Sequence, residues 1–103
     1  MEKYEDENGR VGVLVSRGFG AGWSTWGDDS EFLSMDKTLV EMKLNDAQES
    51  EVSAYCEKII GEQFMGGWSD VCVEWVDKGT SFIIEEHDGS ERLRTSSDLI
   101  LVA

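Results

Sequence analysis

The sequence predicts an α+β domain in which two helices pack on one face of a mainly antiparallel sheet, in the order β-α-α-β-β-β. Two patterns predict this class. Apolar side chains recur every three or four residues in the middle of the chain, as on one face of a helix, and short β-branched and aromatic runs occupy the two flanking parts. Because 103 residues can bury one modest core, we expect a single domain over residues 10–103, preceded by an acidic, frayed arm over residues 1–9.

The first half of the chain predicts one strand and two helices. The β-branched run Val11–Ser16 is expected to form a buried strand. Asp36 is a suitable N-cap for a short helix over Lys37–Leu44, whereas Glu31–Met35 is expected to form a turn or a short strand. In the second helix, Asp46 and Glu49 have capping-box spacing. Its apolar stripe consists of Val52, Tyr55, Cys56, Ile59, Ile60 and Phe64, and Gly61 and the Gly66-Gly67 pair are expected to bring it to its end.

The last third of the chain predicts strands. Val71–Val76 is an apolar, mostly β-branched run, and Ser81–His87 and Glu91–Arg94 flank Asp88-Gly89, which is a strong signal for a short hairpin turn. A final strand is expected over Leu99–Val102.

The charge of the chain limits its partners. Twenty-two acidic residues against nine basic ones give a formal net charge of −13. Nucleic acid and anionic membranes should be repelled, because binding them requires lysines and arginines, whereas a protein with a basic surface should be attracted. Plain solubility explains the same charge equally well. The carboxylates of the second helix, of Glu85-Glu86 and of Asp70, Glu74 and Asp77 also allow a surface that imitates nucleic acid, with a solvated polar face as the alternative.

The compartment is predicted from the termini and the cysteines. No apolar run approaches the length of a membrane span, and the acidic N-terminus lacks the apolar part of a secretory signal, so we expect a cytoplasmic protein. Cys56 and Cys72 have neither CxxC spacing nor a neighbouring histidine, and we interpret them as small buried apolar residues rather than as a disulfide.

The decapeptide from Arg17 to Trp26 is the main candidate for a binding site. Its candidate residues are Arg17, Gly18, Phe19, Gly20, Gly22, Trp23, Ser24 and Trp26. The glycines have GxGxG spacing with Trp23 in place of the third fingerprint glycine, and no GK[ST] follows, so a standard nucleotide fingerprint is disfavoured. Three interpretations stay open: indoles packed in the core, a protein-contact surface, and a small-molecule pocket in which Arg17 holds an anionic group.

Catalytic and metal-binding patterns are weak. His87 is the only histidine, and its place beside a hairpin turn is typical of an exposed side chain. Asp28, Asp29 and Glu31 lack EF-hand spacing, and zinc-type clusters of cysteine and histidine are missing from the sequence. We therefore expect no catalytic residue, no metal, no cofactor and no enzymatic activity.

The chain resembles a group of small uncharacterised bacteriophage proteins. The resemblance rests on Val13–Trp26, with its GFGAGWSTW sequence, and on the later blocks Val73–Val76, Gly79–Phe82 and Ile84–Glu91. It implies a phage origin and a setting in the host cytoplasm, and it carries over no functional residue.

These observations together predict a non-enzymatic protein that binds and inhibits or modulates a host protein with a basic surface. Its expected contact residues are Arg17, Phe19, Trp23 and Trp26. The alternative is a module that binds a small, nucleotide-like ligand through the same loop. A homodimer is expected if the tryptophans are exposed.

Overall fold

The computed structural model describes residues 2–18, 23, 30–61, 67–87 and 90–95. Within them the chain forms β1 (Arg10–Ser16), α1 (Ser30–Met35), α2 (Lys37–Leu44), α3 (Glu49–Ile60), a short 3₁₀-helix η1 (Trp68–Asp70), β2 (Val71–Asp77), β3 (Phe82–His87) and β4 (Ser90–Thr95). The predicted α+β class is confirmed, and the predicted order of elements largely agrees with the structure.

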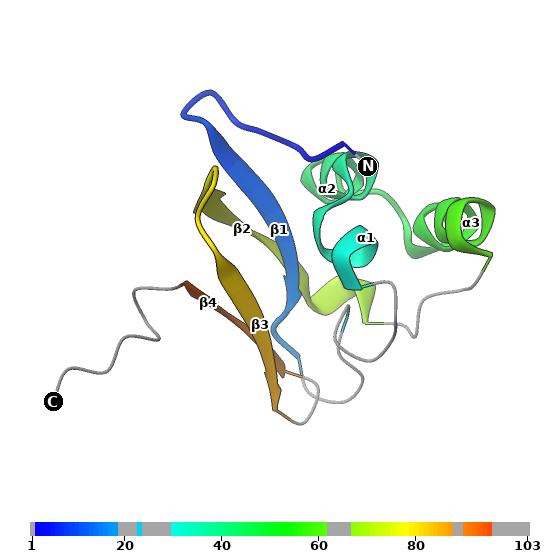
Figure 1. Cartoon of the computed structure of the whole chain (residues 1–103). Coiled ribbons are helices and arrows are strands. Elements are labelled where there is room, and N and C mark those ends of the chain that lie inside the picture. The colour runs from blue at the N-terminus through cyan, green and yellow to red at the C-terminus, as the bar shows by residue number, and fades with distance from the viewer. Residues whose placement is uncertain (1, 19–22, 24–29, 62–66, 88–89, 96–103) are drawn as a thin grey trace, which may run out of the picture.

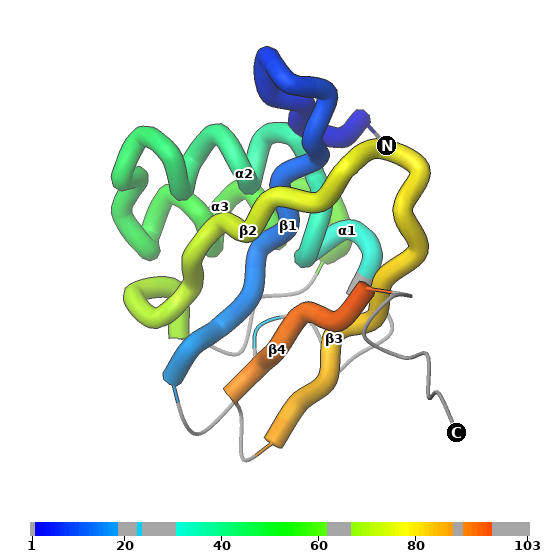
Figure 2. Tube along the Cα trace, turned by 90° about the vertical axis from the view of Figure 1, so that its left-hand side faces the viewer, coloured from blue at the N-terminus to red at the C-terminus, as the bar shows by residue number. Residues whose placement is uncertain are grey.

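The described strands form two antiparallel pairs. β1 pairs with β2, placing Val13 opposite Glu74, and β3 pairs with β4, placing Ile84 opposite Leu93. Figure 1 shows the helices on one side of β1 and β2, with the β3–β4 hairpin on the other side. β4 lies beside the end of β1, as Figure 2 shows from a second direction.

β1 is buried because both of its faces are covered. Leu14 packs toward the helices, whereas Val13 and Val15 pack against apolar side chains of β3 and β4. A strand that is buried on both faces needs a continuous apolar run rather than alternation. This requirement explains the β-branched run that predicted the strand, which begins one residue earlier than expected, at Arg10.

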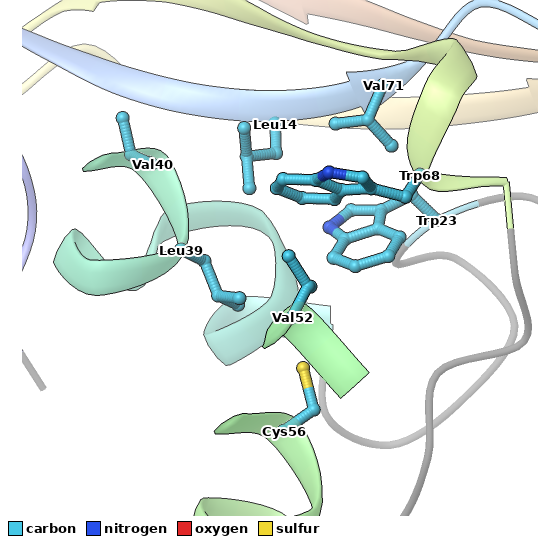
Figure 3. Packing of buried hydrophobic residues seen from close by; sticks show 8 residues of the cluster. All are labelled: Leu14, Trp23, Leu39, Val40, Val52, Cys56, Trp68 and Val71. Carbon is cyan, nitrogen blue, oxygen red and sulfur yellow. The ribbon is translucent and has the colours of Figure 1, made fainter. Parts of the chain in front are cut away.

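The larger core cluster contains two tryptophans (Figure 3). The ring centroids of Trp23 and Trp68 are 5.4 Å apart and the rings are tilted by 52°. Each indole N–H donates to a backbone carbonyl oxygen, Trp23 to Leu33 at 2.5 Å and Trp68 to Ala47 at 2.9 Å. Both large rings are therefore buried without an unpaired indole donor. The cluster is completed by Leu14, Leu39, Val40, Val52, Cys56 and Val71.

The short helix α2 begins as the sequence predicts. The Oδ2 atom of Asp36 accepts from the backbone N–H of Leu39 at 3.2 Å, which is the bond of an N-cap. The same oxygen accepts from the Tyr55 hydroxyl of α3 at 2.7 Å. Burial is the main reason that the pKa of Tyr55 is raised. One carboxylate thus caps α2 and joins it to α3.

Two helix predictions are wrong. Residues 30–35 form helix α1 rather than a turn or a strand. The capping box at Asp46 does not form, because Asp46 has a φ of 55° and the N-cap of α3 is Gln48, whose side chain makes no capping bond. α3 ends at Ile60, where Gly61 takes the left-handed conformation with a φ of 74°. Gly61 is one of the glycines expected to bring this helix to its end, whereas Phe64 and Gly66 lie outside the described residues.

The N-terminal segment is attached to the domain rather than frayed. Gly12 of β1 donates its N–H to the carbonyl oxygen of Tyr4 at 3.0 Å, and Lys37 donates to Glu2 at 2.9 Å. The Asp6 side chain closes the turn before β1 by accepting from the backbone N–H of Arg10 at 2.8 Å. Residues 4–6 therefore pair with the first half of the edge of β1 that faces away from β2, whereas residues 2 and 3 lie along the start of α2. The strand expected over Leu99–Val102 and the turn Asp88-Gly89 lie outside the described residues.

Candidate functional site

A buried carboxylate from β4 holds both ends of the glycine-rich segment. Glu91 is 1 % exposed, and its Oε1 atom accepts from the backbone N–H of Ser16 at 2.9 Å. Its Oε2 atom accepts from the backbone N–H of Trp23, also at 2.9 Å. Such charge-assisted hydrogen bonds are stronger than neutral ones. One side chain thus fastens the end of β1 and the residue seven positions later to the hairpin.

Trp23 belongs to the core rather than to a contact surface. It is 3 % exposed and packs against Trp68. The expectation that the Trp23 ring contacts a partner is therefore wrong, and the core interpretation of this ring is correct. The physical reason is that the Trp23 backbone is held by Glu91 while its indole N–H finds a carbonyl of α1.

Arg17 is the described candidate residue that faces solvent. Its guanidinium forms an ion pair with Glu74 of β2, and its backbone N–H donates to the carbonyl oxygen of Asp70 at 2.9 Å. Hydrogen bonding with the Cys72 sulfur, and secondly the charge of Glu74, raise the pKa of Arg17. Gly18 lies against the Asp70 side chain: a Cβ atom at Gly18 would be 2.3 Å from its Oδ2. The other candidates, Phe19, Gly20, Gly22, Ser24 and Trp26, lie outside the described residues.

Arg17 lies on the wall of a cleft at the end of the β3–β4 hairpin. The cleft has a volume of about 660 Å³, and its described lining is almost entirely charged or polar. The lining residues are Arg17, Glu85, Glu86, His87, Ser90, Glu91 and Arg92. Glu85 is exposed and pairs with Arg94, with Nε and Oε2 2.8 Å apart. The structure thus brings the predicted Arg17 together with the Glu85-Glu86 pair, which lies 68 residues away in the sequence.

His87 is exposed and Cys56 is buried, as the sequence predicts, whereas Cys72 is only half-buried. His87 is exposed at the end of β3 and lines the cleft. Cys56 is fully buried in the core, and burial raises its pKa from 9.0 to about 11. Cys72 is half-buried on β2, and neither cysteine forms a disulfide. No helix in the described part of the chain is long and apolar enough to cross a membrane.

Sequence reasoning missed Glu91. The sequence predicts that Glu91 lies on a hairpin strand, but no pattern in it indicates that the carboxylate is buried, since charged residues are rarely buried. The one available signal is the register of the hairpin. Glu91 and the half-buried Leu93 are two positions apart on β4, so their side chains point to the same face of the strand, toward β1.

No protein-family model matches the chain, and no curated protein or solved structure is significantly similar to it.

Proposed function

We propose that the chain is a small, non-enzymatic phage-type protein that binds a host protein through a basic surface of that protein and inhibits or modulates it. The proposed contact region is the cleft at the end of the β3–β4 hairpin, with Glu85 and Glu86 as carboxylates that receive a lysine or arginine of the partner. Arg17, whose guanidinium is paired with Glu74 but whose side chain is exposed, lies beside them and is the proposed donor to a carbonyl or carboxylate group of the same partner.

The charge of the surface is the observation that carries this proposal. Among the described residues, twelve exposed side chains are carboxylates, and five exposed side chains are lysine or arginine. The exposed carboxylates are those of Glu2, Glu5, Glu7, Glu31, Asp46, Glu49, Glu51, Glu57, Asp70, Asp77, Glu85 and Glu86. Such a field attracts a basic partner over a distance and speeds its encounter at low salt.

The cleft supplies a place for the specific contact. Opposite charges and hydrogen-bonding groups converge there from three parts of the chain, and a concave surface removes more of a bound side chain from water than a flat one. Charge steering alone gives rate rather than specificity, so a shaped site is needed as well.

The alternative of a nucleotide-like ligand on the glycine-rich segment has less support. That interpretation requires backbone amides that are available to an anion. The amides of Ser16 and Trp23, at the two ends of the segment, already donate to the carboxylate of Glu91.

The test is capture of a partner from a host lysate by the tagged protein, at about 50 mM and about 200 mM salt, a range over which the screening length shortens noticeably. We expect one basic host protein to be retained in near-stoichiometric amount at low salt and to be reduced at moderate salt, as mass spectrometry of the retained material would show. A column that retains nothing above the untagged control at either salt contradicts the proposal.

A further inference from the structure

The position of Arg17 depends on contacts made by its neighbours. Ser16, directly before it, is held by Glu91, and the backbone N–H of Arg17 itself donates to Asp70. Its guanidinium pairs with Glu74, and the residue lines the cleft. Anything that releases Ser16 from β4 would also release the residue that follows it.

Burying the Glu91 carboxylate costs free energy unless hydrogen bonds replace those that it would make with water. A carboxylate that is 1 % exposed loses nearly all of its contact with water, and the chain already carries a net charge of −13. Glu86 lies directly opposite on β3, and like charges in this arrangement repel. The two amide donors offset this cost, and both oxygens of a carboxylate can accept, whereas glutamine offers one acceptor and one donor group.

We infer that Glu91 is a positioning residue for the cleft: its carboxylate fixes Ser16 and Trp23 to β4 and thereby holds Arg17 on the cleft wall. This inference rests on the proposed function for the meaning of the cleft. The contact itself stands on two hydrogen bonds from segments far from Glu91 in the sequence.

The first test compares Glu91→Gln with Glu86→Gln by amide hydrogen exchange, measured by NMR. Both variants remove one negative charge from the same pair of facing positions, but only the first alters the acceptors of Ser16 and Trp23. In Glu91→Gln, exchange at Ser16 and Trp23 should accelerate by about tenfold or more, which corresponds to the loss of roughly 1.4 kcal/mol or more of protection. In Glu86→Gln, exchange at these two amides should stay as in the wild type. Unchanged exchange in Glu91→Gln would overturn the inference.

The second test asks whether Glu91 acts through Arg17. The probe is a fluorescein-labelled peptide rich in lysine and arginine, and its affinity is measured for Arg17→Ala, Glu91→Gln and the double variant. If Glu91 serves to hold Arg17, the double variant should bind no more weakly than the weaker-binding single variant. Independent, additive losses would overturn the positioning role, because a merely structural effect of Glu91 would not depend on Arg17.

Two further outcomes are distinguishable. If the wild type does not bind the peptide, the proposed recognition of a basic partner fails, whereas the exchange comparison still decides whether Glu91 holds the two amides. If Glu91→Gln does not fold, amide hydrogen exchange in the wild-type protein tests the inference instead. One carboxylate that holds both amides predicts protection factors for Ser16 and Trp23 within about threefold, because one opening event releases both. A difference of more than tenfold would overturn the inference.

Discussion

Glu86 and Glu91 are direct neighbours across the β3–β4 pair, yet Glu86 is exposed and Glu91 is 1 % exposed. Both residues are glutamates, they are paired in the register of the two strands, and their side chains point to the same face of the hairpin. They differ in what lies next to them, because Glu91 is on the strand beside β1 and meets the amides of Ser16 and Trp23. A glutamate is therefore a surface charge at position 86 of β3 and a buried hydrogen-bond acceptor at position 91 of β4.

Replacing Glu91 with alanine should destabilise the domain far more than replacing Glu86. The change leaves two buried N–H groups without their acceptor, each costing about 1–3 kcal/mol, so the free energy of unfolding should fall by roughly 2–6 kcal/mol. Glu86→Ala, at an exposed position, should change it by no more than about 0.5 kcal/mol. Urea denaturation measures both values. Equal effects of the two substitutions would mean that the Glu91 hydrogen bonds add nothing to stability.

Trp23 should behave as a core residue in mutagenesis. Trp23→Ala removes a ring that packs on Trp68 and should lower the free energy of unfolding by about 3–5 kcal/mol. Trp23→Phe keeps much of the ring volume but loses the hydrogen bond to Leu33, so its effect should be smaller. Thermal unfolding of both variants checks this order, with the half-buried Trp75→Phe as a control. A Trp23→Ala protein as stable as the wild type would contradict the core placement. Consequently, partner binding is better tested without changing Trp23.

Alkaline pH should destabilise the protein through Cys56. Burial raises the pKa of this thiol from 9.0 to about 11, so the unfolded chain loses the proton first as the pH rises. The free energy of unfolding is therefore unaffected by ionisation of Cys56 below about pH 9. It falls between about pH 9 and 11, by roughly 2–3 kcal/mol in total. The measurement is the free energy of unfolding at pH 8 and pH 11 for the wild type and Cys56→Ala.

The difference between these two proteins isolates the Cys56 contribution, because the other titrating groups are common to both. The half-buried Cys72→Ala serves as the control and should retain the decline seen in the wild type. A decline of the same size in Cys56→Ala would show that other groups cause it.

The fold was largely predictable from local patterns. The β-branched run before Arg17 predicted β1, and the Asp36 cap predicted α2, because these signals depend on a few adjacent residues. Helix α1 was missed because residues 31–35 span fewer than two turns, too short for a helical period to stand out. The Asp46 cap failed because Asp46 takes a left-handed conformation in the turn between α2 and α3, which sequence spacing does not reveal.

The candidate site was only partly predictable. Arg17 was selected from the composition of its segment, and it does line a cleft. The partners that surround it are Glu74, Glu85, Glu86 and Glu91, all of them far from Arg17 in the sequence. Their proximity follows from the packing of the hairpin against β1, and single-sequence patterns carry no information about such tertiary contacts.

The central claim is that the cleft carboxylates, rather than the net charge alone, bind a basic host partner. It is tested most directly by lysate capture with Glu85→Gln/Glu86→Gln and with Glu51→Gln/Glu57→Gln. Each double variant removes two exposed carboxylates, the first at the cleft and the second on α3, across the sheet from the hairpin (Figure 1). Equal net charge makes the long-range steering of the two variants comparable. We predict that the cleft variant retains several-fold less of the partner than the wild type, while the α3 variant retains nearly as much as the wild type. Equal losses in both variants would contradict the claim.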